Sequence, residues 1–87
     1  MSPLRISHHE LVPGHRHRWR VHLHGRERPV LVELPPGERR QLDLTDEEVD
    51  ALLPTALQRQ VDADPGALPE EAAWDAPVRV LQTHFMA

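Results

Sequence analysis

The chain has 87 residues, of which 39% are hydrophobic and 28% charged, and it contains no cysteine. This length predicts one domain over residues 1–87, and the composition is typical of a globular protein rather than a disordered one. The sequence has no apolar run long enough for a membrane span and no secretory signal at its start, and without cysteine it has neither a disulfide framework nor a thiolate metal site. We therefore expect a cytoplasmic protein with no membrane partner.

The net charge of −4 hides an imbalance between the two parts of the chain. Residues 1–40 carry eight arginines and four glutamates, whereas residues 41–87 carry two arginines and ten acidic residues. This imbalance predicts a basic face for nucleic acid or for a protein partner, or else a basic sheet that an acidic helix neutralises.

Four strands are expected in the first half of the chain, over residues 4–12, 15–24, 29–34 and 39–44. The segments alternate apolar and polar side chains, as half-buried strands do. Pro13-Gly14 and Pro35-Pro36-Gly37 separate segments and are typical of type II turns. These signals predict an antiparallel meander in which Leu42 and Leu44 face the core.

A helix is expected to begin at Thr45, because Thr45 and Glu48 have the spacing of a capping box. Apolar residues recur at helical spacing from Val49 to Val61, and Asp64-Pro65-Gly66 ends the pattern. Pro54 lies inside the helix and removes a backbone donor. We expect a kink there rather than a break into two short helices, because the apolar stripe keeps its phase.

The C-terminal part predicts a short helical turn over residues 69–74 and a strand over residues 78–85 that returns to the sheet. The expected fold class is therefore α+β. It consists of a four- to five-stranded antiparallel sheet packed on one face by a kinked amphipathic helix.

Residues 15–24 hold four of the seven histidines and three arginines. A tight hairpin around Pro13-Gly14 would pair His8 with Trp19 and place Trp19 in the core. His8, His15 and His17 would then face the core, whereas His9, His22 and His24 would lie on the opposite face. A longer loop would change this pairing, and a type II turn fits a two-residue hairpin poorly.

The core-side histidines define a candidate metal site made of His8, Glu10, His15 and His17. Two histidines spaced as His-x-His on a strand point the same way, and with a carboxylate they could hold zinc or another divalent ion. The sequence contains no compact signature such as His-Glu-x-x-His. We expect instead that these rings are half-exposed side chains and that the protein has no cofactor, with a divalent metal such as zinc as the alternative.

The opposite face defines a candidate binding surface made of Arg16, Arg18, Arg20, His22 and His24. The arginines would stand about 7 Å apart along the strand and could follow a phosphate backbone. The scarcity of aromatic residues and the pI near 5.9 count against nucleic acid.

Enzymatic function has the least support, because the sequence contains no nucleophile elbow, no phosphate-binding glycine loop and no cysteine nucleophile. We expect a non-enzymatic protein–protein interaction module that binds another protein or a second copy of itself through the arginine- and histidine-rich face. Leu11 and Leu31 are expected on the same face. Nucleic-acid binding is the alternative, and metal binding is the third hypothesis.

Overall fold

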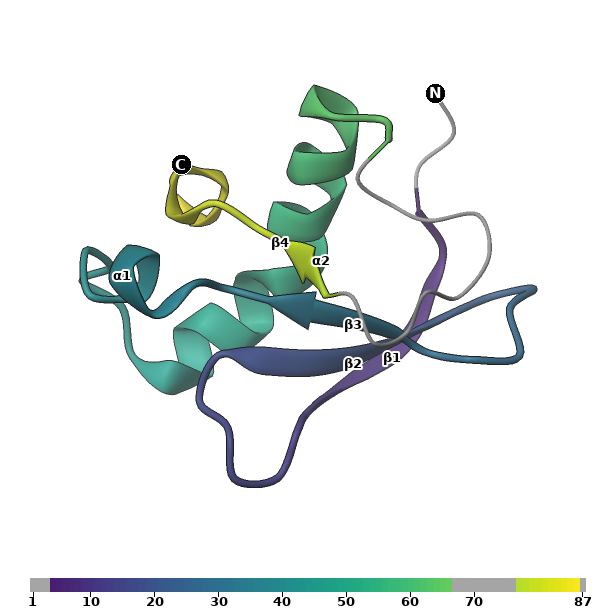
Figure 1. Ribbon diagram of the computed structural model, residues 1–87, viewed down its shortest axis with the longest axis horizontal. Helices are drawn as coiled ribbons and strands as arrows, with labels where there is room; N and C mark the ends of the chain where they lie inside the picture. The colour runs from purple at the N-terminus through teal and green to yellow at the C-terminus, as the bar shows by residue number, and fades with distance from the viewer. Residues whose placement is uncertain (1–3, 67–76, 87) are drawn as a thin grey trace.

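A computed structural model describes residues 4–66 and 77–86, which form a four-stranded sheet and one long helix (Figure 1). The strands are β1 (Ile6–Leu11), β2 (Arg18–Leu23), β3 (Val30–Glu33) and β4 (Val78–Arg79), and they lie side by side in that order. The α+β class is confirmed. The expectation of a purely antiparallel sheet is wrong, because β4 pairs in parallel with β3 after a connection that contains the long helix.

The strand expected over residues 39–44 is wrong. Two helices, α1 (Pro36–Arg39) and α2 (Asp46–Ala63), follow β3 directly. Proline is well suited to the first position of a helix, where its missing N–H has no partner to lose. The positive φ of a type II turn occurs at Gly14 but not at Gly37. The alternating leucines at the end of this segment, Leu42 and Leu44, pack against the edge of the core.

The capping box at the start of α2 is confirmed. The amide of Glu48 donates to the hydroxyl of Thr45 at 3.1 Å, and the amide of Thr45 donates to the carboxylate of Glu48 at 3.2 Å. The helix continues through Pro54 to its end, so the alternative of two short helices is wrong. A kink at Pro54 stays a prediction.

The core lies between α2 and the sheet face that α2 covers, and Trp19 of β2 is buried there as expected. The C-terminal segment closes the core, although only β4 is a strand. The rest of the strand expected over residues 78–85 is wrong, because the helical turn η1 (Gln82–Phe85) replaces it. The turn expected over residues 69–74 lies outside the described residues. The buried apolar side chains come from β2, β3, α2, β4, η1 and their flanking residues: Trp19, Val21, Leu23, Val30, Val32, Leu34, Val49, Leu53, Ala56, Leu57, Val61, Val78, Val80 and Phe85.

The register of the first hairpin differs from the expected one. Ile6 pairs with Leu23, whereas His9 pairs with Val21 and Leu11 pairs with Trp19, because the register shifts between Ile6 and His8. The connection is also longer than two residues, and it closes where the amide of Val12 donates to the carbonyl of Arg18 at 2.9 Å. The shift is a β-bulge, and together with the longer loop it reverses the faces expected for His8 and His9.

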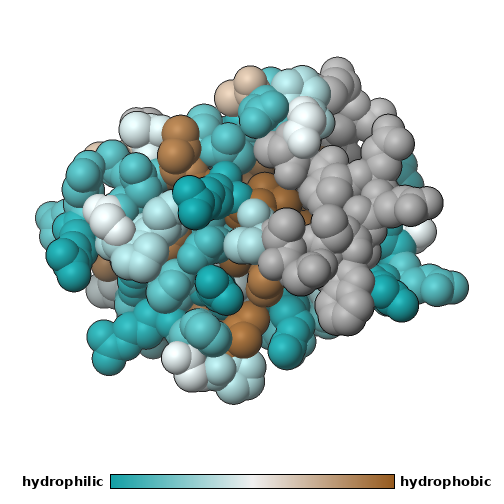
Figure 2. All heavy atoms as spheres, in the orientation of Figure 1, coloured by the Kyte–Doolittle hydropathy of each residue, from teal (hydrophilic) through white to brown (hydrophobic). Residues whose placement is uncertain are grey.

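No helix in the described part of the chain combines the length and the apolar character needed to cross a membrane. The described surface in Figure 2 is mostly hydrophilic, with small hydrophobic areas between polar side chains.

Candidate functional site

The sheet face opposite α2, called the outer face, gathers histidines from two neighbouring strands. The rings of His8 and His22 stack, with their centroids 4.0 Å apart and their planes 14° from parallel. Glu10 lies 3.7 Å from the ring of His22 and pairs in register with Arg20, which is exposed. The outer face therefore combines imidazole, guanidinium and carboxylate groups.

The four residues of the candidate metal site fall into two pairs with different neighbours. His8 and Glu10 both contact His22 on the outer face. The ring of His15 lies perpendicular to that of His17 at 6.0 Å, and His17 lies 3.8 Å from Glu33. Within residues 4–66 and 77–86, no group of three or more histidine or acidic side chains has an arrangement that could hold a metal ion.

The predicted arginine row is divided between strand and loop. Arg18, Arg20 and His22 belong to β2, whereas Arg16 lies in the preceding loop and His24 in the following turn. Leu31 pairs in register with Arg20, but Leu11 lies opposite Trp19 and therefore not on the outer face.

Two separate hollows lie between residues of the β1 segment and α2, and together we call them the β1–α2 crevice. The first is an acidic hollow of about 320 Å³, and the second, of about 410 Å³, we call the apolar hollow because Leu4, Ile6 and Pro54 form half of its lining. The acidic hollow is lined by His9, Glu10, Leu11, Arg16, Trp19, Asp46, Glu47 and Asp50. The apolar hollow is lined by Leu4, Ile6, Pro54, Thr55, Gln58 and Arg59.

His9 connects the two sides of this crevice because of a proline in the helix. Pro54 has no N–H, so the carbonyl of Asp50, four residues earlier, has no partner within the helix. The Nε2 atom of His9 lies 2.9 Å from this carbonyl oxygen and donates to it, because a carbonyl oxygen can only accept. The indole of Trp19 donates to the carboxylate of Asp50 at 3.1 Å. These bonds position β1 and β2 against α2.

The edge of β1 that faces away from β2 is free of any strand in the described part of the chain. The amide of Val12 points toward β2, where it donates to Arg18. Because backbone groups alternate along a strand, the N–H and C=O groups of His9 and Leu11 point toward the free edge. The side chain of Leu11 is 45% exposed beside them.

The acidic hollow carries a negative charge beside this free edge. Four carboxylates line it against one arginine, Arg16, and one histidine. Asp46 is paired with Arg39, and the side chain of Asp50 remains 51% exposed. Glu47 is exposed and has no ion-pair partner among residues 4–66 and 77–86. A cationic side chain would complement this end of the crevice.

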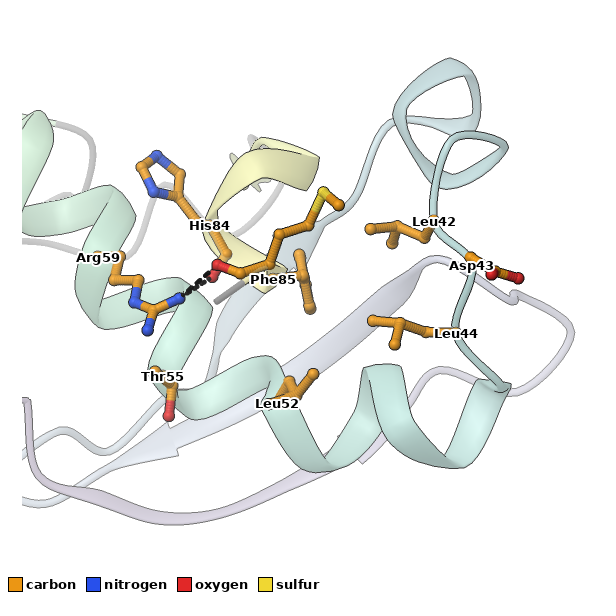
Figure 3. A pocket seen from close by; sticks show the side chains of 9 residues that line it. Leu42, Asp43, Leu44, Leu52, Thr55, Arg59, His84 and Phe85 are labelled. Carbon is orange, nitrogen blue, oxygen red and sulfur yellow. Dashed lines mark hydrogen bonds between the residues drawn. The ribbon is translucent and has the colours of Figure 1, made fainter.

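A second, apolar pocket of about 380 Å³ lies between α2, the segment that precedes it and η1, and we call it the C-terminal pocket (Figure 3). Arg59 borders the pocket and donates from Nη1 to the carbonyls of His84 and Met86, both at 3.0 Å. In Figure 3, Leu42, Leu44, Leu52 and Phe85 approach one another around the pocket, whereas the carboxylate of Asp43 points away.

The residue patterns in the sequence predicted neither the β1–α2 crevice nor the C-terminal pocket. The available signals were a proline inside an amphipathic helix and apolar residues at Leu42 and Leu44 that do not belong to a strand. No family model, no curated protein and no solved structure matches the chain. Only the geometry of these sites therefore bears on function.

Proposed function

We propose that the protein is an interaction module that binds an extended segment of another protein by adding it as a strand to the free edge of β1. The single observation that carries this proposal is the position of that edge along the β1–α2 crevice. In strand addition, main-chain hydrogen bonds supply affinity and hollows for alternate side chains supply specificity.

The backbone of β1 offers a short, defined set of hydrogen bonds. His9 and Leu11 together present two N–H and two C=O groups to an added strand. Alternate side chains of that strand, about 6.8 Å apart, would project toward α2 and into the crevice. The strand would thus be recognised by its backbone and by every second side chain.

Charge specifies the kind of segment that fits. At the acidic end, a lysine or arginine of the partner would lie near the exposed carboxylates of Glu47 and Asp50. At the other end, an apolar side chain would pack against Leu4 and Ile6. The preferred partner is therefore an extended segment that is apolar at one end and basic at the other.

The outer face supports partner binding less well, because Arg18 and His22 already lie beside carboxylates of the chain. Arg18 lies 3.6 Å from Glu33, and His22 lies 3.7 Å from Glu10. Phosphate groups or an acidic partner would have to compete with these carboxylates. Binding of nucleic acid at Arg20 on the outer face is therefore the alternative, and the experiment below distinguishes it from strand addition.

The test begins with selection from a display library of random peptides about ten residues long. Enriched peptides should alternate apolar and polar residues and carry a basic residue at one end. Leu11→Pro removes an outward N–H and leaves the β1–β2 ladder intact, so it should weaken binding about three- to tenfold. Leu11→Thr is the matched control, because it keeps that N–H, and it should bind more tightly than Leu11→Pro.

Three results would contradict the proposal. The first is a library that yields no enriched peptide, and the second is equal binding by Leu11→Pro and Leu11→Thr. The third is binding of random-sequence DNA or RNA that weakens with salt and is lost in Arg20→Glu, which would favour the outer face. A dimer in light scattering that Leu11→Pro leaves intact would identify self-association through another surface.

A further inference from the structure

The C-terminal pocket has the walls of a small-molecule site and a cation at its border. We propose that it binds a small carboxylic acid with an apolar chain, whose chain packs among the leucines and Phe85 and whose carboxylate meets Arg59. The ligand would lie between α2 and η1 rather than along β1, so this inference does not need strand addition, although Thr55 and Arg59 also line the apolar hollow of the β1–α2 crevice.

The apolar walls leave room for a ligand chain. Leu42, Leu44 and Leu52 pack against the core but are only partly buried, and the buried ring of Phe85 forms the side contributed by η1. The pocket volume of about 380 Å³ lies within the range of ligand sites. An apolar chain in the pocket would remove the remaining exposed surface of the leucines from water.

The charge at the border of the pocket selects an anion. Arg59 uses Nη1 for two backbone carbonyls, which hold its guanidinium in place and leave the donors on Nε and Nη2 for a ligand. No carboxylate among residues 4–66 and 77–86 forms an ion pair with Arg59. Asp43 lines the pocket, but its carboxylate points away (Figure 3). A ligand carboxylate can accept two parallel hydrogen bonds from a guanidinium.

The test compares octanoate, octanol and octylamine in NMR titrations of the wild-type protein up to about 1 mM ligand. Octanoate should bind saturably and shift the methyl signals of Leu42, Leu44 and Leu52 and the ring signals of Phe85. Octanol should bind about tenfold more weakly, because it lacks the charge-assisted hydrogen bonds, and octylamine should bind more weakly still.

Variants separate the charge of Arg59 from its structural role. Arg59→Gln keeps a donor for the carbonyls of His84 and Met86, so it should lower octanoate affinity about tenfold and leave octanol affinity unchanged. Leu11→Pro should bind octanoate as the wild type does, so the failure of strand addition is distinguishable from the failure of this site. If Arg59→Gln unfolds, the comparison of the three ligands on the wild-type protein still shows whether the pocket selects a carboxylate.

The proposal is overturned if octanoate produces no saturable shift or if octylamine binds as tightly as octanoate. It is also overturned if the shifted signals belong to the β1–α2 crevice instead of the C-terminal pocket.

Discussion

At the scale of single residues, His9 and Pro54 form a complementary pair. Proline inside a helix leaves a carbonyl without a partner, which costs free energy when the carbonyl is shielded from water. Here the imidazole of His9 supplies the missing donor from β1. Each residue alone looks unfavourable, since one interrupts the ladder of helical hydrogen bonds and the other brings a polar ring toward the core.

This pairing predicts non-additive effects on the free energy of unfolding. His9→Leu should lower it by about 1–2 kcal/mol, because the carbonyl of Asp50 loses its donor. In a Pro54→Ala background the same change should cost about 1 kcal/mol less, since the substituted alanine restores the helical N–H. Urea unfolding of the wild type, both single variants and the double variant measures the difference. Additivity within about 0.3 kcal/mol would contradict the pairing.

Sequence reasoning at this scale succeeded where the partners are close along the chain. Thr45 and Glu48 cap each other across three residues, so their spacing alone predicted the interaction. The partner of His9 lies 41 residues away and depends on the hairpin register. The bulge near Ser7 reversed the faces of His8 and His9, and no residue type in β1 indicated it.

At the scale of elements, the free edge of β1 predicts an alternating pattern of amide hydrogen exchange. The amides of His8, Glu10 and Val12 point toward β2 and should exchange at least about tenfold more slowly than those of His9 and Leu11. Residue-resolved exchange measured by NMR, corrected for intrinsic rates, provides the comparison. Uniform protection along β1 would mean that another segment covers the edge, and it would remove the basis for strand addition.

The helix was easier to predict than the strands. Its cap and its apolar stripe are local, and α2 begins at the predicted cap and runs through Pro54 as one helix. Alternation over residues 39–44 covers too few residues to separate a strand from a turn, and in the structure Arg39 ends α1 and irregular backbone follows it. The parallel pairing of β4 depends on how the chain crosses the sheet, which residue alternation does not encode.

At the scale of the whole molecule, the core is one cluster that α2, the sheet and the C-terminal segment share. Phe85 is 3% exposed in this cluster, so Phe85→Ala should lower the free energy of unfolding by about 3–4 kcal/mol. Because the core is continuous, tryptophan fluorescence and far-UV circular dichroism should report one coincident transition. Met86→Ala is the control, since Met86 is 53% exposed and its loss should change stability by about 0.5 kcal/mol or less.

The two candidate sites belong to this scale and could not be predicted from residue patterns. The C-terminal pocket needs Leu42, Leu52 and Phe85 from three separate segments. The β1–α2 crevice needs β1 at the edge of the sheet, which follows from the strand order. The charge imbalance, in contrast, was visible in the composition, and it is partly neutralised between the two parts of the chain where Arg39 pairs with Asp46.

The two edges of the sheet are unequal in length, and this limits how many molecules strand pairing can join. Across the described residues, one edge is the six-residue β1 and the other is the two-residue β4. Fibril growth needs a pairing surface on both sides of every subunit, so that each added chain presents a new template. If only β1 can pair, a molecule that has paired through β1 offers no second edge to another molecule. From the edges that residues 4–66 and 77–86 provide, we therefore expect pairing at β1 to join two molecules rather than to build a fibril.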